Sequence, residues 1–74
     1  MWIKTQNNIY VNTEQLEALE FDSRLNSIYG HYRTDIRYVV LGEYVRPDDE
    51  KVKDIELAFF TALENNEVLF VMPR

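Results

Sequence analysis

Residues 47–72 form a stretch in which a well-delimited helix pattern leads directly into a strand without a polar face. Pro47 suits the first turn of a helix, and the acidic residues that follow it suit the positive end of the helix dipole. Apolar residues then recur at helical spacing as far as two asparagines at residues 65–66, and asparagine readily takes the left-handed conformation at a helix end. The pattern predicts a helix over residues 48–65 and a strand over residues 68–72.

The predicted helix carries a small apolar patch opposite its main apolar face. With 100° of rotation per residue, the main face consists of Val52, Ile55, Ala58, Phe59, Ala62 and Leu63. Leu57 and Phe60 fall nearly opposite this face, and side chains three positions apart are neighbours on a helix surface. Exposed apolar patches of this kind mark contacts with other proteins. We therefore predict a protein interface that includes Leu57, Phe60, Lys53 and Glu64.

Residues 68–72 and 38–41 have no polar face, a pattern typical of strands in a sheet that is covered on both sides. One long helix covers only one side. A chain of 74 residues also buries only about 60% of the surface that its unfolded form exposes, so its stability alone is marginal. Small chains add disulfides, a metal or oligomerisation, and this chain has no Cys and a single His. The sequence therefore predicts self-association, with a homodimer as the simplest assembly.

The N-terminal residues predict a β-hairpin followed by a short helical turn. Two runs rich in β-branched and aromatic residues lie within residues 2–11, separated by a polar turn in which an Asn can adopt a positive φ. Asn12 and Thr13 can each cap the next segment, in which Leu16 and Leu19 lie three apart. This spacing favours a helical turn before the next strand.

Residues 21–32 alternate only roughly, which favours one strand with a bulge near Asn26 or Gly30. Residues 36–45 are apolar on both faces at their centre and predict a central strand. Because a strand, helix, strand connection is right-handed when its strands are parallel, the last strand is expected to run parallel to this one, adjacent or one place away. The alternative is exchange of the last strand into a partner subunit.

Together these elements predict a single domain over residues 1–74, of the α+β class. We expect a mostly antiparallel sheet of about five strands, in the order ββαββαβ, with one long C-terminal helix packed on one face. No repeat, linker or low-complexity segment interrupts the chain.

The N-terminal pattern also carries a resemblance. Residues 1–5, MWIKT, followed by residues 9–12, IYVN, resemble the start of small uncharacterised proteins of Gram-positive bacteria and their phages or mobile elements. In those proteins a short hairpin leads to an Asn-capped turn. The resemblance implies a bacterial or phage source and transfers no functional residue.

The sequence offers little for catalysis or for ligand binding. Ser23 and Ser27 lie near His31, but neither stands in the sharp, glycine-flanked turn that exposes a nucleophile. The acidic run at residues 48–50 is explained by the helix dipole rather than by a metal. The two glycines do not form a phosphate-binding loop. We expect no enzymatic activity, no cofactor and no metal.

The net charge of −5 argues against a strong general nucleic-acid binder. The middle of the chain is nevertheless basic and aromatic, and sheets that present both kinds of side chain can hold single-stranded nucleic acid. The possible contacts there are Tyr29, His31, Tyr32, Arg33 and Arg37. The competing interpretation is that these are ordinary strand tyrosines and edge arginines.

The preferred function is a small, non-catalytic protein-interaction domain, a homodimer that binds through its exposed sheet face or its helix. One alternative is a phage or mobile-element inhibitor of a host nucleic-acid enzyme, in which acidic residues imitate phosphates. The second alternative is a weak single-strand binder. No stretch approaches the ~20 apolar residues of a membrane span and no export signal is evident, so we expect a cytoplasmic protein.

Overall fold

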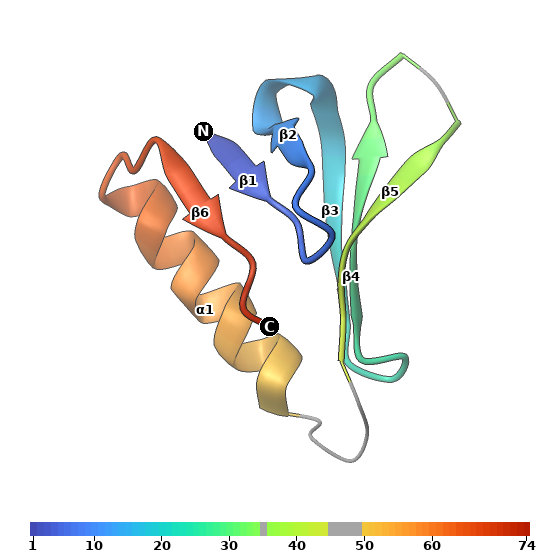
Figure 1. The fold of residues 1–74 in the computed structure, drawn as a ribbon, viewed down its shortest axis with the longest axis vertical. Coiled ribbons are helices and arrows are strands. Elements are labelled where there is room, and N and C mark those ends of the chain that lie inside the picture. The colour runs from blue at the N-terminus through green and yellow to red at the C-terminus, as the bar shows by residue number, and fades with distance from the viewer. Residues whose placement is uncertain (35, 45–49) are drawn as a thin grey trace.

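The computed structural model describes residues 1–34, 36–44 and 50–74 (Figure 1). Its elements are β1 (Trp2–Lys4), β2 (Tyr10–Asn12), a 3-10 turn η1 (Thr13–Gln15), β3 (Leu16–Asp22), β4 (Ser27–Tyr32), β5 (Tyr38–Glu43), α1 (Glu50–Glu64) and β6 (Leu69–Val71). The strands form two sheets: β2-β1-β6, called the terminal sheet below, and β3-β4-β5, called the middle sheet. The strand pairs are antiparallel except for β1 with β6.

The α+β class is confirmed, whereas the single sheet and the order ββαββαβ are not. The strands are divided between two three-stranded sheets. β5, which was expected to be central, lies at an edge of the middle sheet, and β6 pairs in parallel with β1 instead of β5. The helix between β5 and β6 therefore connects two different sheets, and the handedness rule for parallel strands of one sheet does not apply to it.

The N-terminal hairpin is confirmed. β1 and β2 pair antiparallel, and Asn8 takes a φ of 63° in the turn between them. The Thr5 N–H donates to Ile9 O at 2.8 Å, and the Ile9 N–H donates to the Thr5 hydroxyl at 3.1 Å. Asparagine tolerates the left-handed region better than most residues, so this turn closes without a glycine.

Leu16 and Leu19 lie in β3 rather than in a helical turn. Asn12 does cap the segment, because its Oδ1 accepts the Glu14 N–H at 3.0 Å, but only the 3-10 turn η1 follows. A register shift between Leu16 and Ala18 adds an extra residue to β3. This bulge turns Leu16 and Leu19 toward the same face of the strand, although they lie three positions apart.

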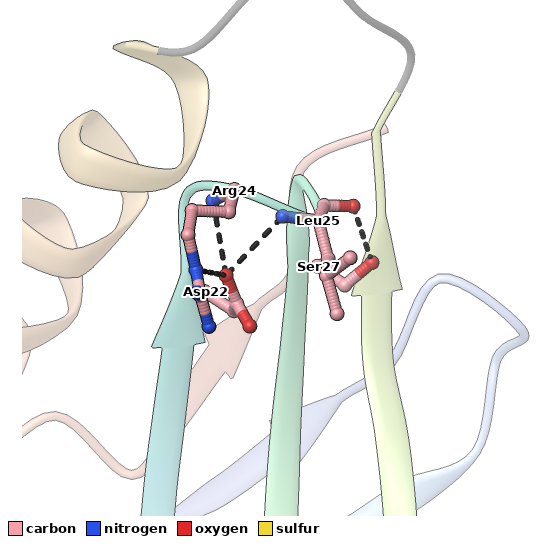
Figure 2. Close-up of polar contacts among 4 residues, drawn as sticks. All are labelled: Asp22, Arg24, Leu25 and Ser27. Carbon is pink, nitrogen blue, oxygen red and sulfur yellow. Dashed lines mark hydrogen bonds and ion pairs between the residues drawn. The ribbon is translucent and has the colours of Figure 1, made fainter.

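The segment expected to be one strand over residues 21–32 is a tight hairpin (Figure 2). Asp22 Oδ1 accepts the N–H groups of Arg24 at 2.9 Å and of Leu25 at 3.2 Å, which turns the chain. Asn26 then takes a φ of 52° before β4 begins. The predicted irregularity at Asn26 is therefore the left-handed position of a turn and not a bulge within a strand.

The two sheets are joined at a bulge in β5. The register between β4 and β5 shifts between Ile28 and Tyr29, which leaves Leu41 as an extra residue. The Leu41 carbonyl accepts the Gln6 N–H, just beyond β1, at 3.0 Å. Gln6 Oε1 in turn accepts the Glu43 N–H at 2.7 Å. The bulge thus makes a backbone carbonyl available for a contact between the sheets.

The hydrophobic core lies between α1 and the inner faces of both sheets. α1 runs alongside β6 (Figure 1), and the Phe59 ring lies 5.4 Å from the Phe70 ring and 6.1 Å from the Phe21 ring of β3. The buried apolar residues are Ile3, Val11, Leu16, Ile28, Leu41, Val52, Ile55, Phe59 and Met72. Phe59 therefore connects the helix to a strand of each sheet.

The helix ends where its asparagines predict. Asn66 takes a φ of 55°, and its N–H donates to Leu63 O at 3.1 Å. The Glu67 N–H donates to Ala62 O at 3.0 Å, and these two bonds together form a Schellman motif. The predicted helix start at residues 47–49 lies outside the described residues.

Tyr44 follows β5 and holds the C-terminal segment. Its hydroxyl donates to Pro73 O at 2.7 Å, and Gln6 Nε2 donates to the same oxygen at 3.2 Å. Burial raises the pKa of Tyr44 from 10.0 to about 12. The fold therefore favours the neutral phenol.

Replacement of Tyr44 by phenylalanine should change how stability depends on alkaline pH. The contribution of the neutral phenol is complete below the unfolded-state pKa of 10.0 and declines as the pH rises toward about 12. The unfolding free energy of the wild type should therefore fall more steeply across this interval than that of Tyr44→Phe. Urea unfolding of both proteins from about pH 8 to about pH 12 measures the difference. Parallel profiles would show that Tyr44 does not titrate differently in the folded and unfolded chains.

Candidate protein interface

One face of the terminal sheet is largely apolar and uncovered. Side chains alternate across a strand, so Ile3, Val11 and Phe70 point toward the core and their strand neighbours point away from it. The outward side chains are Trp2, Lys4, Tyr10, Asn12, Leu69 and Val71. Trp2 is 47% exposed and Val71 is 55% exposed. This exposed apolar face is therefore a candidate contact surface.

The apolar part of this face, with the residue that precedes β6, is called the outer patch below: it consists of Trp2, Tyr10, Val68, Leu69 and Val71. All except Val71 line a shallow depression. Among the described residues, the strands of the terminal sheet place one charged side chain on this face, that of Lys4. Its Nζ lies 5.8 Å from the centre of the Tyr10 ring. The face therefore combines aromatic and aliphatic surface with one central cation.

The helix patch predicted from the sequence is smaller than expected. Leu57 is 70% exposed, and Lys53 and Glu64 are exposed beside it. Phe60 is 48% exposed, and its ring lies 6.4 Å from the Phe21 ring of β3. Phe60 thus belongs partly to the contact between α1 and the middle sheet, and Leu57 remains the most exposed apolar side chain of the predicted interface.

The predicted nucleic-acid residues do not share one face. Tyr29 and His31 point outward from the middle sheet, where their rings lie 5.6 Å and 6.2 Å from the ring of Tyr38. Tyr32 instead packs against the hydrophobic core. Arg33 is exposed in the turn after β4, and its Nε donates to a backbone carbonyl oxygen, that of Glu14, at 3.0 Å. Arg37 is exposed just before β5.

A carboxylate also lies on the outer face of the middle sheet. Glu20 Oε1 is 3.0 Å from His31 Nε2. Glu20 pairs with Tyr29 in the register of β3 and β4, so its charge lies among the aromatic rings. A negative charge at this position opposes phosphate binding.

The Ser27 hydroxyl and the His31 ring have different hydrogen-bond partners. The Ser27 hydroxyl donates to Leu25 O at 3.0 Å in the hairpin turn, and His31 contacts Glu20 instead of a serine. Within residues 1–34, 36–44 and 50–74, no group of three or more His, Asp or Glu side chains is placed to hold a metal ion. Residues 48–49 of the acidic run lie outside this described part.

Trp2, Tyr10 and Leu69 belong to the outer patch, and the sequence analysis did not name them as candidate interface residues. The signal was present in the alternation of the two hairpin strands, because Trp2 and Tyr10 each precede a residue that faces the core. An aromatic residue on the solvent side of a strand is therefore predictable once the inward residue is known.

No helix in the described ranges is long and apolar enough to cross a membrane. No protein-family model matches the chain, and no curated protein or solved structure matches it significantly.

Proposed function

We propose that this chain is a non-catalytic protein-interaction domain that works as a homodimer. The outer patch supports this proposal most directly, because it leaves large apolar side chains in water on the side of the terminal sheet opposite the core. Burial of apolar surface stabilises a complex by about 25 cal/mol per Å² before the costs of association. A partner on this face therefore removes an unfavourable contact with water.

The size of the chain is compatible with such a contact. A standard interface removes about 800 Å² of surface from each partner. The chain exposes 5229 Å², so an interface of that size covers about 15% of its surface. The outer face of the terminal sheet, with the residues that flank it, is a suitable region for this contact.

Sedimentation equilibrium tests the proposal. The full chain, studied from about 1 µM to about 1 mM, should show a mass that approaches that of two chains as the concentration rises. A mass of one chain throughout this range would contradict the homodimer.

A further inference from the structure

The outward side chains of the terminal sheet form two rows across its strands. The register of β1 with β2 and with β6 defines both rows. The first row is Asn12, Trp2 and Leu69, and the second row is Tyr10, Lys4 and Val71. Trp2 and Lys4 occupy the centres of their rows, because β1 is the central strand.

Two copies of this face can pack together about a two-fold axis in either of two simple orientations. With the axis along the strands, each row meets itself, and Lys4 meets Lys4 of the second copy. Two like charges facing each other in a contact that excludes water repel strongly. With the axis across the strands, the first row of one copy meets the second row of the other copy.

The second orientation makes the face complementary to itself. Lys4 of one copy then faces Trp2 of the other, and tryptophan is the aromatic ring that attracts a cation most strongly. Lys4 Nζ already lies 5.8 Å from the Tyr10 ring, so it would be held between aromatic rings of both copies. In the same orientation Leu69 faces Val71 of the second copy.

We infer that the partner on the outer patch is a second copy of this chain, packed face to face with its β1 strand antiparallel to the first. This inference rests on the proposed homodimer and specifies its geometry. The match between the cation and the aromatic rings carries it: with β1 antiparallel to β1 of the second copy, each Lys4 faces a Trp2 ring and the two Lys4 side chains do not meet. The described strands of the terminal sheet place no carboxylate on this face, although the chain has a net charge of −5. The face is therefore the place where two acidic chains can approach with a cation and aromatic rings between them.

Charge substitutions at Lys4 test the geometry. Lys4→Glu places a carboxylate against the Trp2 ring of the second copy and should raise the dissociation constant at least about tenfold. Lys4→Arg keeps the cation and should change the constant by less than about threefold. Trp2→Leu removes the opposite partner, and Lys4→Glu combined with Trp2→Leu should weaken the dimer by less than the product of the two single effects. Circular dichroism checks that each variant is folded.

The fluorescence of Trp2 supplies an independent measurement, since the chain has a single Trp. Dilution should shift the Trp2 emission to longer wavelength with the same midpoint as the change in mass. A dimer whose Trp2 emission is unchanged by dilution, and in which Lys4→Glu has no effect, would overturn the face-to-face geometry and leave the homodimer in place. A wild-type chain that stays at the mass of one chain would overturn both.

Discussion

Replacement of Phe59 by alanine is expected to destabilise the protein by about 3 to 5 kcal/mol, the usual cost of removing a buried aromatic side chain. Phe59 is 2% exposed, and its ring contacts Phe70 of the terminal sheet and Phe21 of the middle sheet. Its loss leaves a cavity where α1 meets both sheets. Domains are stable by only about 0.05 to 0.15 kcal/mol per residue, so this change removes a large part of the total.

Phe60→Ala is the matched control for this prediction. Phe60 is the next residue of α1 and the same kind of side chain, but it is 48% exposed. Its truncation should cost about 1 kcal/mol, because much of its surface is already in water. Urea unfolding at one fixed protein concentration measures both variants, since self-association would otherwise change the apparent stability. Equal costs for Phe59 and Phe60 would show that the core is not centred on Phe59.

The features predicted correctly from the sequence depend on local chemistry. Asn8 and Asn66 adopt positive φ because their short polar side chains tolerate that conformation, and Asn12 caps the segment that follows it. The helix follows from apolar spacing and from its asparagine end. Each of these inferences needs only a few neighbouring residues, which a single sequence supplies.

The features predicted wrongly depend on bulges and on pairing between distant strands. The bulge between Leu16 and Ala18 gives a strand the apolar spacing of a helix. Gly30 suggested a bulge, but it has a packing role: an added Cβ would lie 3.0 Å from Leu16 Cδ1 and 3.3 Å from Val39 Cγ1. Neither the bulge in β3 nor the packing role of Gly30 can be predicted without knowing which strand lies beside it.

The pairing of β6 with β1 joins the two ends of the chain, which no local pattern encodes. The uninterrupted apolar run at residues 68–72 predicted a strand covered on both sides, and β6 does lie within this run. Within one chain it receives cover on one side only, because Phe70 packs against Phe59 while Val68 is 78% exposed and Val71 is 55% exposed. The strand was therefore predictable from its apolar residues, but which of its side chains point away from the core depends on the register of the terminal sheet.

A comparison of two double substitutions should show which apolar surface forms the dimer. Leu69→Glu with Val71→Glu places two carboxylates on the outer patch, whereas Leu57→Glu with Phe60→Glu places two on the helix. Full burial of one such apolar side chain is worth ~1.5 to 3 kcal/mol, and Leu69 and Val71 are 41% and 55% exposed in the single chain. Because each substitution occurs twice in a homodimer, the sheet variant should lose about 4 kcal/mol of association free energy, which corresponds to a dissociation constant about a thousandfold higher.

The helix variant should keep a dissociation constant within about threefold of the wild type, because Leu57 and Phe60 lie outside the proposed contact. Phe60→Glu also removes the contact with the Phe21 ring, so this variant should be less stable to urea while it remains a dimer. Sedimentation equilibrium of both variants, with circular dichroism to confirm that they are folded, separates association from folding. The reverse result, a dissociated helix variant and an intact sheet variant, would move the interface to Leu57, Phe60, Lys53 and Glu64. Leu69 and Val71 point away from the core on the terminal sheet, whereas the Phe60 ring contacts Phe21 of the middle sheet, so the two pairs of substitutions test different surfaces.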